Sequence, residues 1–180
     1  MKKIHFALVK LPVISITLFF CCCLVAALIH PGSEKEIIDF KMDRYSFTHN
    51  FLSELGSFKT NTDETNPLII QEDNTPSMLL FNGSLIFIGA TLVLFYIQFK
   101  EVFIQINDTD KAQKYGALTK PLGILAGILY AGVGFVPHDL HFGAHVFFAN
   151  GAFLVLFFLC VFHSISVYHS KFLSNRYAFG

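Results

Sequence analysis

The stretch that decides the fold is Met78–Phe99, MLLFNGSLIFIGATLVLFYIQF, which runs for 22 residues without a charged side chain. A helix needs about 20 apolar residues to cross the hydrocarbon of a bilayer. Backbone N–H and C=O groups find no water partner there, so such a run is expected to be helical. Three further runs have the same character, at residues 11–28, 121–137 and 146–167.

Together these runs predict an all-α fold, a polytopic transmembrane four-helix bundle with helices at about residues 8–29, 78–99, 117–137 and 143–168. We expect one integral membrane domain over residues 1–180, with a long external loop at residues 30–77 that carries a short amphipathic helix. Apolar residues make up 53% of the chain and charged residues 14%, against about 25% charged in soluble proteins. Lys+Arg and Asp+Glu number 13 each, and no basic patch is present, which excludes nucleic-acid binding.

The charges in the connections predict the orientation. The segments on the N-terminal side carry nine Lys or Arg and three acids, whereas the opposite side carries four and ten. Positively charged connections stay in the cytoplasm, so we expect a multi-pass protein of the cell membrane with both termini cytoplasmic. The first run is expected to be a retained helix rather than a cleaved signal peptide, because bulky Leu28 and Ile29 follow Ala26 and Ala27.

The first half of the loop, residues 45–56, mixes apolar and polar side chains. Thr48 is suited to cap a short helix and Gly56 to end it in the left-handed conformation. One interpretation is an amphipathic helix that rests on the membrane surface or over the bundle. The other is a lid that brings His49, Ser53 and Glu54 over a site. Ser53, Glu54 and Asp139 are then the candidate catalytic residues.

A stripe of small residues runs along the third apolar segment at Gly123, Gly127, Ala131 and Gly134. Small residues let membrane helices approach closely. We expect the partner face to lie on the fourth segment, at Ala149 and Ala152.

Residues 137–145 read PHDLHFGAH. If the fourth helix begins near Pro137, His138, His141 and His145 share one side of it. These groups could form a polar turn, a hydrogen-bond network with residues 49–54, or a Zn²⁺ site. In the metal interpretation His141 and His145 are two ligands and His49 or His138 is the third. Asp139 then accepts a proton from a ligand imidazole.

Three motifs resemble a known family: SFTHNFLSELG at residues 46–56, LFNGSL at residues 80–85, and VGFVPHD at residues 133–139 followed by His145. Together they are similar to the domain-of-unknown-function 998 family of polytopic membrane proteins. Members usually have two helices more than the four expected here, so the resemblance implies that a final pair is missing. A more distant similarity is to the alkaline ceramidase and adiponectin-receptor-like membrane hydrolases, and it implies a zinc-dependent cleavage of lipid amides.

Two functions remain open. The first is a non-enzymatic structural, assembly or lipid-interacting membrane component, whose polar His/Asp junction is purely architectural. Its partners would be membrane lipid and a membrane protein or a second copy of the chain. The alternative is a zinc-dependent membrane hydrolase that acts on a lipid amide or ester at the outer leaflet. Both interpretations expect residues 46–56 to pack against residues 137–145.

Overall fold

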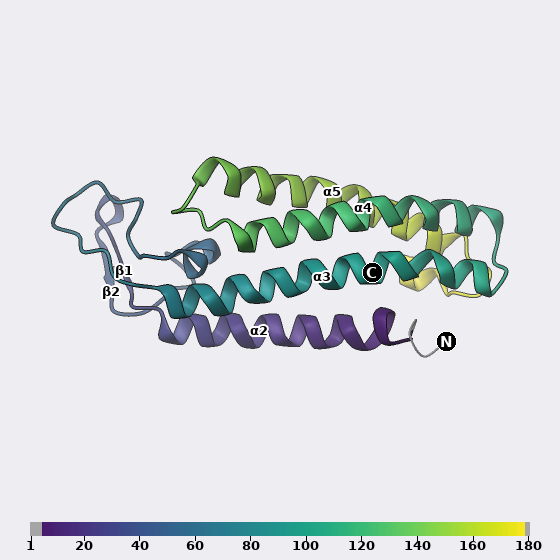
Figure 1. The fold of residues 1–180 in the computed structure, drawn as a ribbon, viewed down its shortest axis with the longest axis horizontal. Coiled ribbons are helices and arrows are strands. Elements are labelled where there is room, and N and C mark those ends of the chain that lie inside the picture. The colour runs from purple at the N-terminus through teal and green to yellow at the C-terminus, as the bar shows by residue number, and fades with distance from the viewer. Residues whose placement is uncertain (1–4, 179–180) are drawn as a thin grey trace.

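The computed structural model describes residues 5–178. Within that range, four helices are long and apolar enough to cross a membrane. They are α2 (Leu11–Ile29, continued backwards by the π-helix η1, Phe6–Lys10), α3 (Thr75–Gln105), α4 (Asp110–Phe135) and α5 (Phe142–Tyr168). Helices adjacent in the sequence pack side by side, α2 on α3, α3 on α4 and α4 on α5 (Figure 1). The predicted all-α four-helix fold is therefore confirmed.

Two helices extend past the apolar runs. α3 continues beyond Phe99 to Gln105, because Phe103 is fully buried in the core. α4 begins at Asp110, where the Thr109 hydroxyl accepts a hydrogen bond from the Ala112 backbone at 3.1 Å. A side chain that satisfies a free N–H group of the first turn is a normal helix start. Hydropathy reveals only the part of a helix that lies in hydrocarbon, so these polar ends were not expected.

Small residues bring α3 and α4 into close contact. A side chain at Gly127 would lie 2.4 Å from the Gly89 carbonyl oxygen, and one at Gly123 would meet the Tyr96 side chain at 2.3 Å. The stripe on α4 therefore packs against α3. The expectation that this stripe meets α5 was wrong, because Gly134 also faces α3, at Asn82. α5 packs on another side of α4, where Gly132 accommodates Phe148 of α5. Backbones approach closely only where no side chain intervenes.

The loop between α2 and α3 contains more structure than expected. Strands β1 (Ser33–Lys35) and β2 (Phe40–Met42) form an antiparallel hairpin around the short 3₁₀-helix η2 (Glu36–Ile38). The predicted amphipathic helix is reduced to the 3₁₀-helix η3 (Leu52–Gly56). A single bridge pairs Lys59 with Asp73 where the loop returns to α3.

Two hydrophobic clusters hold the bundle, one near each end. At the loop end, Tyr45 and Leu55 of the loop pack with Ala26 of α2 and Phe81 of α3. At the other end, aromatic side chains of α3 pack with α4, with α5 and with the 3₁₀-helix η4 (Asn175–Ala178).

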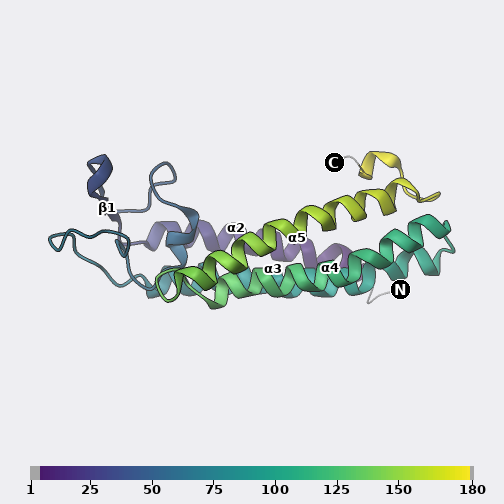
Figure 2. The same ribbon diagram turned by 90° about the horizontal axis from the view of Figure 1, so that it is seen from above.

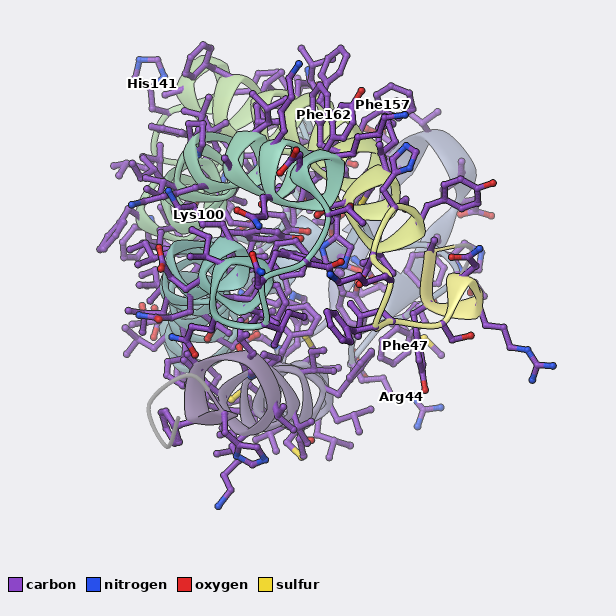
Figure 3. All side chains as sticks on the ribbon, turned by 90° about the vertical axis from the view of Figure 1, so that its right-hand side faces the viewer. Arg44, Phe47, Lys100, His141, Phe157 and Phe162 are labelled. Carbon is purple, nitrogen blue, oxygen red and sulfur yellow. The ribbon has the colours of Figure 1, made fainter. Side chains whose placement is uncertain are left out.

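The last helix has a largely uncovered apolar surface. α5 is inclined to the other three helices (Figure 2). Phe157 points outward from it when the molecule is viewed along the bundle (Figure 3), and its side chain is 62% exposed. Exposed apolar surface of this extent suits contact with lipid tails. The fold is thus that of an integral membrane protein.

Candidate functional site

The residues predicted to form a site lie at the end of the bundle that carries the loop. We call this region the loop junction. It consists of residues 54–59 of the loop, residues 74–82 at the start of α3, and residues 136–145 between α4 and α5. In Figure 1 these segments meet at the left end of the bundle, with β1 and β2 beyond them.

Asn82 lies at the centre of the loop junction. Its side-chain amide donates a hydrogen bond of 2.9 Å to the Gly56 carbonyl oxygen. A side chain at Gly56 would lie 2.3 Å from Asn82 Oδ1, and one at Gly134 would lie 2.6 Å from the Asn82 carbonyl oxygen. Gly56 was expected to end a helix in the left-handed conformation, but Gly32 is the one glycine with positive φ within residues 5–178. Gly56 instead permits the loop to approach α3.

Asp139 fastens the loop to the turn between α4 and α5. Its Oδ2 accepts hydrogen bonds from the backbone N–H groups of Phe58 at 2.8 Å and Lys59 at 3.1 Å. Beside it, His138 Nδ1 lies 3.1 Å from the Ser57 hydroxyl. The loop therefore meets this turn through residues 57–59, directly after the segment 46–56 that was expected to do so. Asp139 binds backbone here rather than a ligand imidazole.

Asn74 and Ser77 hold the polypeptide of η3 against the start of α3. The fully buried Asn74 amide donates to the carbonyl oxygens of Ser57 at 2.9 Å and Glu54 at 3.2 Å. The Ser77 hydroxyl donates to the Leu55 carbonyl oxygen at 3.1 Å. Sequence reasoning missed both residues. Asn74 stands at the N-cap position of α3 but its side chain makes no capping hydrogen bond, so a capping pattern does not reveal its contacts with the loop.

Glu54 is engaged within the loop itself. One carboxylate oxygen pairs with Lys35 Nζ at 2.9 Å and also accepts the Phe51 backbone N–H at 2.9 Å. The other accepts a hydrogen bond of 2.6 Å from the Asn50 side chain. Ser53, its neighbour, has no side-chain hydrogen bond to any described residue. The two loop candidates for catalysis therefore do not form a nucleophile–base pair.

His141 and His145 act locally on the start of α5. His141 precedes the first helical residue, Phe142, and its Nδ1 accepts the Ala144 backbone N–H at 3.1 Å. Its ring points away from the bundle (Figure 3). His145 Nδ1 lies 2.7 Å from the Val136 carbonyl oxygen, so this nitrogen carries the proton that is donated. The two rings thus serve different hydrogen bonds.

His49 and His138 make contacts in two different parts of the loop end. The His49 ring stacks on Phe40 at a centroid distance of 4.2 Å, and its Nδ1 lies 2.8 Å from the Thr48 hydroxyl. His138 is buried beneath the loop, and its ring lies 5.9 Å from that of His145. His49 therefore belongs to the hairpin, whereas His138 belongs to the turn between α4 and α5.

The structure does not bring the predicted zinc ligands together. Within residues 5–178, no group of three or more His, Cys, Asp or Glu side chains is arranged to hold a metal ion. The expected set of His141, His145, and His49 or His138 assumed a helix that begins near Pro137. Because α5 begins only after His141, His138 lies in the preceding turn and His141 serves as a helix cap.

A small polar cavity lies between the hairpin and the loop junction. Its volume is about 10 Å³, and His30, Glu54 and His138 are among the residues that line it. A cavity of this size holds about one water molecule. Burial lowers the pKa of His30, and the Glu54 carboxylate offsets part of that effect. Since His30 Nδ1 accepts the Gly32 backbone N–H at 3.1 Å, its neutral ring carries the proton on Nε2.

A second polar cluster closes the opposite end of the bundle. The Asp108 carboxylate accepts hydrogen bonds from the Ser170 hydroxyl at 2.5 Å and from the backbone N–H groups of Lys171 at 2.9 Å and Thr109 at 2.7 Å. Burial alone would raise the pKa of Asp108, but these hydrogen bonds leave it below its ordinary value. Asp108 therefore ties the α3–α4 turn to the end of α5.

No protein-family model, curated protein or solved structure matches this chain. The site must therefore be interpreted from its own geometry.

Proposed function

We propose that this chain is a non-enzymatic, architectural component of the cell membrane, in which the loop junction holds a folded acidic loop, residues 30–74, on the outer surface of a lipid-embedded bundle. One observation carries this proposal. The carboxylates of Glu54 and Asp139 and the rings of His141 and His145 all make hydrogen bonds that fix local backbone or neighbouring side chains. Each of these groups holds the fold through at least one polar atom, and the described residues give them no shared metal-binding arrangement.

The size of the polar cavity supports the same proposal. An enzyme site is a concavity that takes most of its substrate, and the cavity beside Glu54 and His138 holds about one water molecule. A lipid amide or ester does not fit such a space. The hydrolase alternative also needs three metal ligands with an open fourth position, and residues 5–178 place no such group.

We also propose membership of the domain-of-unknown-function 998 family. The three motifs that carry the resemblance supply the residues that meet at Asn82, namely Gly56 from the first motif, Asn82 from the second and Gly134 from the third. A shared architectural role for the motifs would explain why they occur together. On this proposal the loop junction is the common feature of the family.

The test is made on the purified full-length chain in lipid nanodiscs. Zinc content is measured by mass spectrometry, and hydrolysis of a fluorescent ceramide is followed with added Zn²⁺. We expect less than stoichiometric zinc and no turnover. His145→Ala is expected to lower the thermal unfolding midpoint, since it removes the bond to Val136. His5→Ala, at the opposite end, serves as the control.

A zinc-dependent hydrolase would give a different result in the same experiment. One zinc ion per chain with ceramide turnover, both lost in His145→Ala while the unfolding midpoint is kept, would overturn the architectural proposal in favour of the hydrolase.

A further inference from the structure

A stripe of exposed side chains runs along α5 on the side of the helix that faces away from the bundle. At 3.6 residues per turn, its five members point within about 40° of one common direction. The buried residues Ala152 and Leu159 lie on the opposite side of α5. All five members are exposed, and we call them the α5 stripe. They are Phe147, Asn150, Leu154, Phe157 and Val161.

The spacing of the α5 stripe suits a second helix that packs along it. Its residues follow one another at intervals of three, four, three and four. This is the heptad spacing by which two helices pack side by side in a shallow left-handed crossing, the commonest arrangement of membrane helices. Apolar side chains alone do not select a helix over lipid, because lipid tails are equally apolar. The polar member of the stripe makes that distinction.

Asn150 is an exposed amide that has no hydrogen-bond partner in the chain. Within residues 5–178 its side chain makes no hydrogen bond, although it offers two donors and a carbonyl oxygen. On either side of it along the stripe lie Phe147 and Leu154, which supply no polar group. Hydrocarbon tails cannot bond to an amide, and a polar group left unpaired among them is costly.

Asn150 lies near the middle of the membrane. A side chain at the adjacent Gly151 would contact Leu129 of α4 at 3.3 Å. Two residues further along α4, the Ala131 backbone nitrogen would lie 2.9 Å from a side chain at Gly89 of α3. Gly89 stands at the centre of the 22-residue apolar run of α3. Asn150 is therefore about half a bilayer away from water on either side, and its short side chain cannot reach it.

A second copy of the chain supplies the group that Asn150 requires. Copies of a membrane protein insert in the same orientation, so a two-fold axis perpendicular to the membrane brings each residue of the α5 stripe close to its own copy at the same depth. An amide is complementary to itself, since each of two Asn150 side chains can donate one hydrogen bond to the other and accept one from it. Two-fold dimers of this kind are the commonest protein oligomers.

From these observations we propose that the α5 stripe is a homodimer interface, in which Asn150 of one chain forms hydrogen bonds with Asn150 of its copy. Phe147, Leu154, Phe157 and Val161 pack against their counterparts around this pair. The interface lies on the opposite side of α5 from α4 and does not include the loop junction. Its test is therefore independent of the architectural role proposed above.

Energy transfer between full-length chains in phosphatidylcholine vesicles tests the interface. Chains carrying a donor or an acceptor fluorophore are mixed over a range of protein-to-lipid ratios. We expect wild-type protein to dimerise, and Asn150→Leu to lower the association constant by about threefold to thirtyfold, as the loss of a hydrogen bond between membrane helices would give. Asn150→Gln keeps an amide and should retain most of the association. Because Asn150 makes no bond within the chain, Asn150→Leu should not lower the thermal unfolding midpoint of dilute protein.

Disulfide cross-linking in cell membranes locates the interface on α5. The four native cysteines are first replaced by alanine, and one cysteine is then introduced. Leu154→Cys should give a disulfide-linked dimer under oxidation. Leu24→Cys is the matched control, because Leu24 lies on α2 and is 58% exposed, close to the 60% of Leu154, and it should remain monomeric.

Three results would refute the interface. One is wild-type protein that stays monomeric at every protein-to-lipid ratio. Another is an association constant that is unchanged in Asn150→Leu. The third is a cross-link from Leu154→Cys to a different membrane protein in place of its own copy, which would assign the α5 stripe to another partner.

Discussion

Asp139 Oδ2 lies 2.8 Å from the backbone nitrogen of Phe58, so one carboxylate in the α4–α5 turn holds a loop segment 81 residues earlier in the sequence. The same oxygen accepts the Lys59 N–H group. Two backbone donors of the loop thus depend on one side chain. This contact gives the acid that follows His138 a structural role in holding the loop.

Asp139→Ala should loosen the loop. It leaves two backbone N–H groups without their acceptor, which costs roughly 1–3 kcal/mol. Hydrogen–deuterium exchange of a peptide containing Phe58 and Lys59 should quicken by about tenfold or more. Asp139→Asn keeps one acceptor oxygen and should have a smaller effect. Asp43→Asn, an exposed acid of the same loop, is the control, and equal exchange in it and in Asp139→Ala would contradict the anchoring role.

Gly56→Ala should destabilise the loop junction. The added methyl group would lie 2.3 Å from Asn82 Oδ1 and 2.9 Å from Phe81 Cδ1, and overpacking of this kind costs roughly 1–3 kcal/mol. The thermal unfolding midpoint is the measurement. Gly83→Ala is the matched control, since nothing lies within 4 Å of its added methyl group and alanine favours a helix over glycine. A midpoint for Gly56→Ala at or above that of Gly83→Ala would show that the close approach is not required.

The membrane bundle could be predicted from sequence because one physical constraint, the absence of water in hydrocarbon, acts on each run independently of the rest of the chain. Met78–Phe99, for example, can be recognised as an apolar run without knowing which helix it packs against. The partner of the Gly127 stripe could not be predicted in this way. Both Gly89 on α3 and Ala152 on α5 are small residues, and only the packed arrangement shows that α3 meets the stripe.

The site was harder to predict because its geometry depends on where α5 begins. A start near Pro137 would align His138 with His145, whereas the observed start at Phe142 makes His141 a cap. The hairpin β1–β2 was missed because strands of three residues give too short an alternation to recognise. Asn74 and Asn82 act through carbonyl oxygens more than 15 residues away in sequence, and no local pattern encodes such contacts.

The orientation of the bundle can be tested by cysteine labelling. Asp63 is an exposed loop residue, with 66% of its side chain accessible, and the charge bias predicts that it lies outside the cell. We expect Asp63→Cys to react with a membrane-impermeant maleimide in intact cells. Lys111→Cys, in the first turn of α4 at the other end, should react only after lysis. Wild-type protein controls for the four native cysteines, and the reverse pattern would invert the topology.

The cluster around Asp108 should make the opposite end of the bundle sensitive to acid. The pKa of Asp108 lies below the ordinary value of 3.8 because Ser170 and two backbone N–H groups donate to its charged form. A group whose pKa is depressed by folding contributes stability above its unfolded pKa and loses that contribution as the pH falls through the folded value. The protection of the Lys171 amide, measured as its exchange rate relative to the intrinsic rate at the same pH, should therefore be kept at pH 5 and fall below about pH 4 in wild-type protein.

Asp108→Asn separates this effect from general acid unfolding. The amide cannot carry the charge and presents one acceptor oxygen in place of two. Protection of the Lys171 amide should therefore be lower than in wild-type protein at pH 5 and should change less between pH 5 and pH 3. Glu101→Gln removes a nearby carboxylate that makes no side-chain hydrogen bond within residues 5–178, and it should retain the wild-type profile. If Asp108→Asn showed the same loss of protection below pH 4 as wild-type protein, the acid sensitivity would belong to another group, and Asp108 would hold the α3–α4 turn to α5 without governing its response to pH.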